Sequence, residues 1–167
     1  MSASPGKMFV SVGGGYACVK ITGRANCNSS IDFKTLLNEL MQQGCTRFIL
    51  DLSECLLMDS TFLGVLAGFG LRSGPGNPIE LCAPNARILE LLENLGVIHL
   101  FKVVQEPAAC DAASTREHPV TVPGKEEVTE TCLEAHNILM GIDPSNVARF
   151  KDVTRFLAED LKKLKGR

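Results

Sequence analysis

Residues 48–66 read FILDLSECLLMDSTFLGVL, in which an apolar run, a polar corner and a second apolar run follow one another. The segment TRFILDLS at 46–53 is a nearly continuous apolar run, which is typical of a β-strand covered on both faces. The segment STFLGVLAGFGLRSG at 60–74 predicts a helix despite its internal glycines. The corner Asp59-Ser60-Thr61 therefore falls where a buried strand gives way to a helix.

Segments on both sides of this stretch complete an alternating pattern. Strands are expected at 8–12, 16–23, 79–84 and 98–104, and helices at 29–44 and 85–97. The first two strands are separated by GGG at 13–15, as in a hairpin, and Ser29 or Ser30 can cap the first helix. The order predicts an α/β domain with a mostly parallel or mixed sheet of four to five strands and helices packed on it.

The chain changes character after about residue 105. The segment 105–127 contains three prolines, few large apolar residues and no periodicity, which indicates a linker or an excursion over the surface. Two helices are then expected at 126–141 and 144–167, with Asp143 or Ser145 capping the second. We therefore divide the chain into a first domain at 1–106, a linker at 107–125 and a C-terminal helical extension at 126–167.

The two C-terminal helices are too short to fold alone, because about 40 residues seldom bury enough surface. The second helix has one apolar face, formed by Phe150, Val153, Leu157, Leu161 and Leu164. We expect the pair to dock on the first domain, on a second copy of itself in a homodimer, or on a partner.

Composition excludes several classes of protein. The 167 residues carry 17 basic and 19 acidic side chains, which argues against direct binding of nucleic acid. The N-terminus lacks the apolar stretch of a signal peptide, and no apolar run approaches the roughly 18 residues that cross a bilayer. The sequence therefore predicts a cytoplasmic protein without membrane insertion.

The sequence offers no candidate for catalysis, for a metal or for a cofactor. None of the three histidines, His99, His118 and His136, lies in a motif with a nucleophile. The seven cysteines are odd in number and form no C-x-x-C pair, which argues against a disulfide framework and a zinc site; they are Cys18, Cys27, Cys45, Cys55, Cys82, Cys110 and Cys132. We expect most of them to be small buried side chains.

The polar corner can cap the helix that follows, since Asp, Ser and Thr all accept hydrogen bonds from free N–H groups of a first turn. A hydroxyl there is expected to be exposed at the sheet edge, where phosphorylation would add about −1.5 to −2 charges. Helical spacing places Ser60 at the head of a stripe of small residues that includes Gly64 and Gly68. Such a stripe allows close approach either by the backbone of a partner or by the chain's own sheet.

The stretch FILDLSECLLMDSTFLGVLAGF at 48–69 resembles the signature of the STAS domain, the fold of bacterial anti-sigma factor antagonists. In that signature a strand ending in Asp-Leu-Ser leads to Asp-Ser-(Ser/Thr)-Gly-Leu-Gly at the start of a helix. The resemblance covers about residues 5–106. It implies that the serine after the aspartate is phosphorylated by the anti-sigma factor, a GHKL-type serine kinase, and dephosphorylated by a metal-dependent serine phosphatase. The unphosphorylated antagonist captures the anti-sigma factor and so regulates transcription indirectly.

Carried over by position, the resemblance makes Ser60 the phosphoacceptor, with Thr61 as second choice. The implied partner-binding residues are Asp59, Ser60, Thr61, Gly64 and Gly68. Phe62 stands where the family usually has Gly, and its bulk beside the acceptor is expected to alter which kinase fits or to abolish phosphorylation. Asp32 and Asn26 lie near the place where the family has a loop that faces its partner.

The sequence is also compatible with a second function, that of a protein-binding scaffold. Proteins that resemble STAS domains also occur in stress-signalling assemblies and as soluble subunits of membrane transport systems, where they bind other proteins without being switched. The C-terminal helical pair favours this reading, because an added amphipathic pair can serve as an assembly surface. The alternatives are therefore a phosphorylation-switched antagonist and a scaffold that is not switched.

Overall fold

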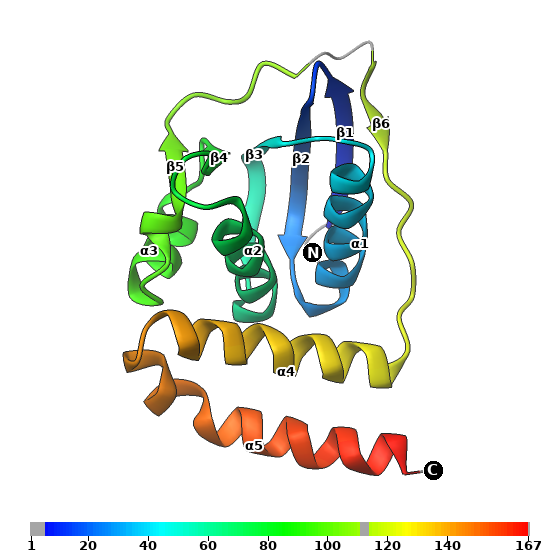
Figure 1. Cartoon of the computed structure of the whole chain (residues 1–167), viewed down its shortest axis with the longest axis vertical. Helices are drawn as coiled ribbons and strands as arrows, with labels where there is room; N and C mark the ends of the chain where they lie inside the picture. The colour runs from blue at the N-terminus through cyan, green and yellow to red at the C-terminus, as the bar shows by residue number, and fades with distance from the viewer. Residues whose placement is uncertain (1–5, 111–113, 167) are drawn as a thin grey trace.

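The computed structural model describes residues 6–110 and 114–166, and its centre is a six-stranded mixed sheet (Figure 1). The strand order is β5-β4-β3-β2-β1-β6. Strands β2 to β5 are parallel, while β1 runs antiparallel to both of its neighbours. The strands are β1 (Lys7–Gly13), β2 (Tyr16–Ala25), β3 (Arg47–Met58), β4 (Ile79–Cys82), β5 (Phe101–Val104) and β6 (Arg116–Glu117).

The alternating order and the α/β class are confirmed, but the expected four to five strands fall short of the six observed. The additional strand is β6, which lies in the segment expected to be a linker. Arg116 and Glu117 pair with Val10 and Phe9 on the free edge of β1. A strand of two residues is too short to show a periodic pattern in the sequence. The chain is extended there because the outer edge of β1 offers backbone N–H and C=O groups that need hydrogen-bond partners.

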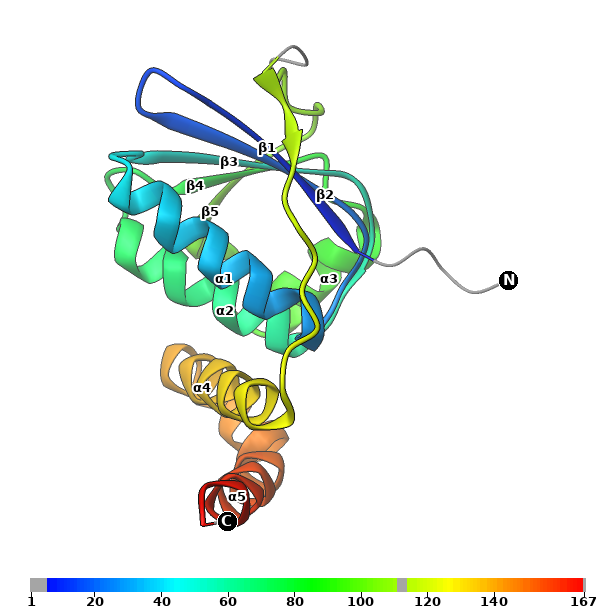
Figure 2. The ribbon, with the colours of Figure 1, turned by 90° about the vertical axis from the view of Figure 1, so that its right-hand side faces the viewer.

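Helices α1 (Cys27–Gln42), α2 (Ser60–Ser73) and α3 (Ala86–Asn94) all cover the same face of the sheet (Figure 2). Helix α1 begins earlier than expected, because Asn26 and not Ser29 or Ser30 caps it: the Asn26 side chain accepts from the Asn28 and Ser29 N–H groups. The large apolar side chains of these helices and of the facing strand residues form one continuous core.

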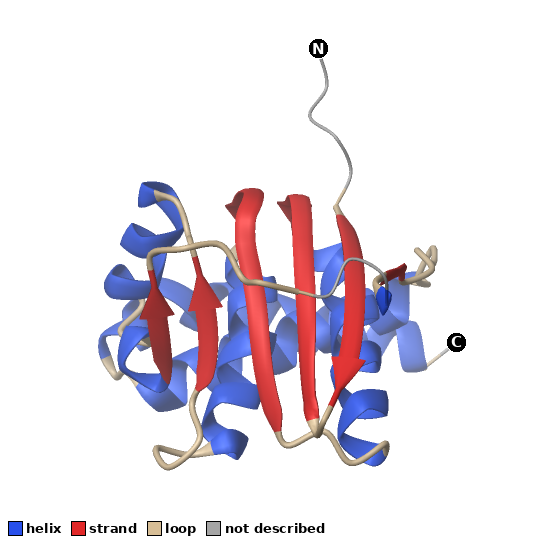
Figure 3. Ribbon diagram, turned by 90° about the horizontal axis from the view of Figure 1, so that it is seen from above, coloured by secondary structure: helices blue, strands red, loops and turns tan. Residues whose placement is uncertain are grey.

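The opposite face of the sheet carries no helix in the described part of the chain, so helices cover β3 on one face only. The segment from β5 towards β6 crosses this face instead (Figure 3). It is attached to β2 by a disulfide between Cys18 and Cys110, whose Cα atoms lie 6.0 Å apart. The prediction that the cysteines form no disulfide is wrong for this pair. Ninety-two residues separate the two cysteines, so their spacing gives no local signal.

Helices α4 (Lys125–Ile142) and α5 (Ser145–Lys165) form two further layers beneath α2 (Figures 1 and 2). Helix α4 lies across α2 on the side away from the sheet, and α5 packs against α4. Ala135 and Leu139 of α4 are fully buried and join the core of the domain. Of the three expected modes of docking, the structure shows docking on the first domain; the homodimer stays a prediction.

Buried polar contacts hold both ends of α4. Before α4, the buried carboxylate of Asp32 accepts from the Thr121 N–H at 3.0 Å and from the Thr121 hydroxyl at 2.5 Å. At the turn into α5, the Asn146 side-chain amide donates to the backbone carbonyls of Leu95 and Leu139, both at 2.9 Å. The position of α4 over α2 is therefore fixed at two places.

None of the helices in the described residues combines the length and the apolar character of a membrane-spanning segment.

Candidate functional site

The polar corner joins the starts of two helices. Asp59 is the N-cap of α2, and its carboxylate accepts from the Phe62 N–H and from the Cys27 N–H at the start of α1, both at 2.8 Å. The expected capping role is thus confirmed for Asp59. Burial raises the pKa of this carboxyl above its usual range, while the two backbone hydrogen bonds oppose that rise. The bond to Cys27 was not predicted, because it links residues 32 positions apart.

Ser60 and Thr61 lie in the interface between α2 and α4, and not at an exposed sheet edge as the sequence led us to expect. The Ser60 Oγ is 2.8 Å from the Nε2 atom of His136, and the Thr61 Oγ1 is 3.2 Å from the Sγ atom of Cys132. Ser60 is half-buried, whereas Thr61 and His136 are each 4% exposed. Helix α4 therefore occupies the surface that the resemblance assigns to an outside partner.

The tautomer of His136 follows from its other nitrogen. Nδ1 lies 2.7 Å from the backbone carbonyl of Cys132, and a carbonyl oxygen only accepts. Nδ1 must therefore carry a proton, which leaves Nε2 of the neutral ring to accept the Ser60 hydroxyl. His136 lies in no sequence motif with a nucleophile, yet the fold brings it to the Ser60 hydroxyl, 76 positions away. The two groups nevertheless face each other across a closed helix interface, so their contact serves docking of α4.

Gly64 and Gly68 of the stripe on α2 face α4, and neither the sheet nor an open surface. A Cβ atom added at Gly64 would overlap the backbone carbonyl of Ala135, and one added at Gly68 would lie 3.1 Å from the Ile138 side chain. Backbones of helices approach this closely only where one of them lacks a side chain. The sequence suggested that the stripe allows close approach by a partner or by the chain's own sheet. In the structure it packs instead on α4 of the C-terminal extension.

Phe62 does not add bulk beside the acceptor. Its side chain is fully buried and stacks on Phe33, with ring centroids 4.6 Å apart. The expectation that it crowds Ser60 is wrong, because the residue at this position points into the core. Asp32 and Asn26 likewise serve the fold: Asp32 binds Thr121, and Asn26 caps α1.

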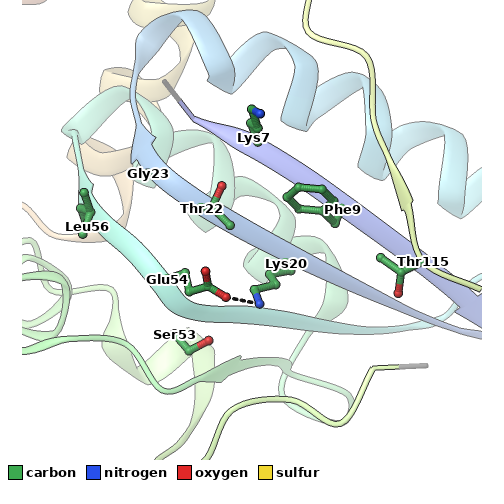
Figure 4. A pocket seen from close by; sticks show the side chains of 9 residues that line it. All are labelled: Lys7, Phe9, Lys20, Thr22, Gly23, Ser53, Glu54, Leu56 and Thr115. Carbon is green, nitrogen blue, oxygen red and sulfur yellow. Dashed lines mark ion pairs between the residues drawn. The ribbon is translucent and has the colours of Figure 1, made fainter. Parts of the chain in front are cut away.

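A pocket lies on the face of the sheet that carries no helix, away from the Ser60 corner, and has a volume of about 810 Å³ (Figure 4). An ion pair between Lys20 and Glu54 crosses it. Its lining residues are Lys7, Phe9, Lys20, Thr22, Gly23, Ser53, Glu54, Leu56 and Thr115. None of the predicted site residues lies here. Among the described residues, no group of three or more His, Cys, Asp or Glu side chains is placed to hold a metal ion.

The sequence matches the STAS domain family over residues 10–109, and the chain belongs to that family. The similar solved structures include TM1081 of Thermotoga maritima, a proposed anti-sigma factor antagonist. Its crystal structure has 19% sequence identity and a TM-score of 0.50, and covers 57% of this chain and 83% of TM1081. Its NMR structure has 19% identity and a TM-score of 0.52, and covers 58% and 79%.

The anti-sigma factor antagonist SpoIIAA in its unphosphorylated form has 14% identity and a TM-score of 0.51, and covers 58% of this chain and 87% of SpoIIAA. At these identities the likeness establishes the fold. No curated protein is significantly similar to the chain. The family match ends before α4, so the cover over Ser60 lies outside it.

Proposed function

We propose that the chain is a non-enzymatic binding module that acts as an anti-sigma factor antagonist. The observation that carries the proposal is the position of Ser60, the first residue of α2, directly after the capping Asp59 in a STAS domain. In its unphosphorylated form the module captures an anti-sigma factor of the GHKL-type serine kinase class. Gly64 and Gly68 extend the binding surface along α2 once α4 has left it.

The switch is phosphorylation of Ser60. The kinase transfers the γ-phosphoryl group of ATP to the Ser60 Oγ, the hydroxyl proton is lost to solvent and ADP leaves. A metal-dependent phosphatase hydrolyses the phosphoserine with water, which restores the hydroxyl and releases phosphate. The added dianion is favoured by the N-terminus of α2 and opposed by the neighbouring Asp59, so the local potential changes strongly. Ser60 ranks ahead of Thr61, because Thr61 is almost fully buried.

Phosphate mapping tests this function. The full chain is incubated with Mg-ATP and an extract of the source cells, and phosphopeptides are identified by mass spectrometry. Label is expected on Ser60, lost in Ser60→Ala and retained in Thr61→Val. In a pull-down of the kinase that phosphorylates it, Ser60→Asp should bind more weakly than Ser60→Ala. Equal binding would show that charge at this corner is not the switch.

A scaffold that is not switched is the second candidate, and the hydrogen bond from Ser60 to His136 under α4 favours it. The Ser60 hydroxyl is covered by α4 and already hydrogen-bonded, so it has a structural role that does not depend on phosphorylation. The same mapping experiment separates the two functions. Absence of phosphate on both Ser60 and Thr61, with partner binding retained, would favour a scaffold in a stress-signalling assembly or a transport system.

A further inference from the structure

We infer that the C-terminal helical pair is a built-in occupant of the Ser60 surface, and that docking of α4 and a phosphoryl group on Ser60 exclude each other. The same docking excludes an outside partner from α2. The identity of that partner rests on the proposed function, whereas the exclusion itself rests on contacts within the chain.

A phosphoryl group on Ser60 has no room beneath the docked α4. The imidazole of His136 fills the space next to the Ser60 Oγ, since Nε2 lies 2.8 Å from it. A phosphoryl group bonded to that oxygen would take the same space. Helix α4 cannot tilt to make room, because Ala135, the residue before His136, lies against Gly64, one turn further along α2. The helix must therefore leave α2 over several residues at once.

Charge also acts against docking of α4 on a phosphorylated Ser60. The half-buried carboxylate of Asp59 lies directly beside the acceptor, and Lys34 and Lys165, which bind α4, are already paired with Glu134 and Glu130. In the docked state a dianion on Ser60 would therefore lie next to Asp59 under the cover of α4, where like charges are screened less than in water, whereas undocking would return both groups to solvent. Size and charge both act against the docked state.

Helices α4 and α5 are expected to move together. Phe150 of α5 packs on the His136 ring, with ring centroids 4.7 Å apart. Undocking would expose the buried Ala135 and Leu139, and this cost keeps the unmodified chain closed. An outside partner binds only the open fraction, so its apparent affinity is lowered by that fraction.

Phosphoserine incorporated at position 60 of the full chain tests the exclusion without any partner. Amide hydrogen exchange in α4 and maleimide labelling of Cys132 are expected to be at least tenfold faster than in the unmodified chain. Phosphoserine at the exposed position 53 and the variant Ser60→Ala are the controls, and both should stay protected. Unchanged protection of α4 with phosphoserine at 60 would overturn the inference.

A reversible crosslink tests the blocking of the site. In Thr61→Cys the new thiol faces the native Cys132, which lies 3.2 Å from the present Thr61 oxygen. Mild oxidation by an added low-molecular-weight disulfide, reduced in turn to its thiol, should lock α4 on α2. The locked chain should then gain phosphate on Ser60 at least tenfold more slowly in a reductant-free source-cell extract with Mg-ATP.

The matched control is the double variant Thr61→Cys/Cys132→Ser, which cannot form the lock and should respond to neither oxidation nor reduction. Equal phosphorylation of the locked and released chains would overturn the inference. Absence of label in the released chain and in the control would count against the proposed function alone, because the exchange experiment uses no kinase.

Discussion

At the scale of single residues, the Ser60 corner combines contacts from two distant helices, α1 and α4. Asp59 binds the start of α1, Ser60 meets His136 of α4, and Phe62 fills the core beside Phe33. Three positions within four residues of the sequence thus point in different directions, as residues around a first helical turn must. The family signature identifies the corner, but the direction of each side chain depends on the helices around it.

Phe62 is expected to be a core residue, although the family usually has Gly at this position. Phe62→Ala should lower the free energy of unfolding by about 3–5 kcal/mol, because a fully buried aromatic ring is lost and a cavity remains. Phe156→Ala is the matched control, since Phe156 is 77% exposed and its loss should cost less than about 1 kcal/mol. Urea denaturation measures both. A loss of similar size in the two variants would contradict the buried position of Phe62.

The Asp59 carboxyl should make stability depend on pH in a defined direction. Burial raises its folded-state pKa above the ordinary 3.8, so the folded chain binds this proton more tightly than the unfolded chain. The contribution of the group to stability is therefore largest below pH 3.8 and is lost as the pH rises through the folded-state pKa. Relative to Asp59→Asn, the wild-type chain should gain stability between pH 7 and pH 4 in chemical denaturation. A constant difference across this range would show that the pKa is not raised.

At the scale of elements, the helices were predictable where their signals are local. The apolar stripes, the breaks at glycine and proline and the alternation of strands and helices define α1 to α5 within a few residues. The position of α4 was not predictable, because its contacts join Ser60 and Thr61 to residues more than 70 positions away. The stripe of small residues indicated close approach correctly, but nothing in its pattern shows which element approaches.

Gly64 provides the clearest test of this helix contact. Gly64→Ala should stabilise α2 as an isolated helix by about 1 kcal/mol, yet its methyl group would overlap the backbone of Ala135 and push α4 away. We expect a lower melting temperature and faster maleimide labelling of Cys132. Gly141→Ala is the control within α4, because no heavy atom lies within 4 Å of its new Cβ. If both variants were stabilised equally, α4 would not be docked on α2.

At the scale of the whole molecule, the chain closes over its sheet on both sides. The helical pair covers α2 on one side, and the segment after β5 crosses the open face on the other, attached by Cys18–Cys110. Both closures come from the last third of the sequence, where composition indicates only a linker and two amphipathic helices. Sequence reasoning therefore describes the STAS domain well and the cover around it poorly, since long-range pairing leaves no local pattern.

The Cys18–Cys110 disulfide predicts a thiol count for the molecule. Five of the seven cysteines are free. Denatured protein without reductant should react with five equivalents of iodoacetamide, and reduced protein with seven. In the native state Cys55 should react slowest at pH 8, because burial raises the pKa of its thiol to about 11. Seven equivalents without reductant would show that the bridge does not form.

The late position of α4 in the chain also has a consequence in time. It begins about 65 residues after Ser60, so at a synthesis rate of roughly 5–20 residues per second it emerges roughly 3–13 seconds later. During that interval the growing chain presents the Ser60 corner without its cover. A kinase acting on the nascent protein would therefore need no opening of the helical pair, whereas one acting on the finished protein would depend on it.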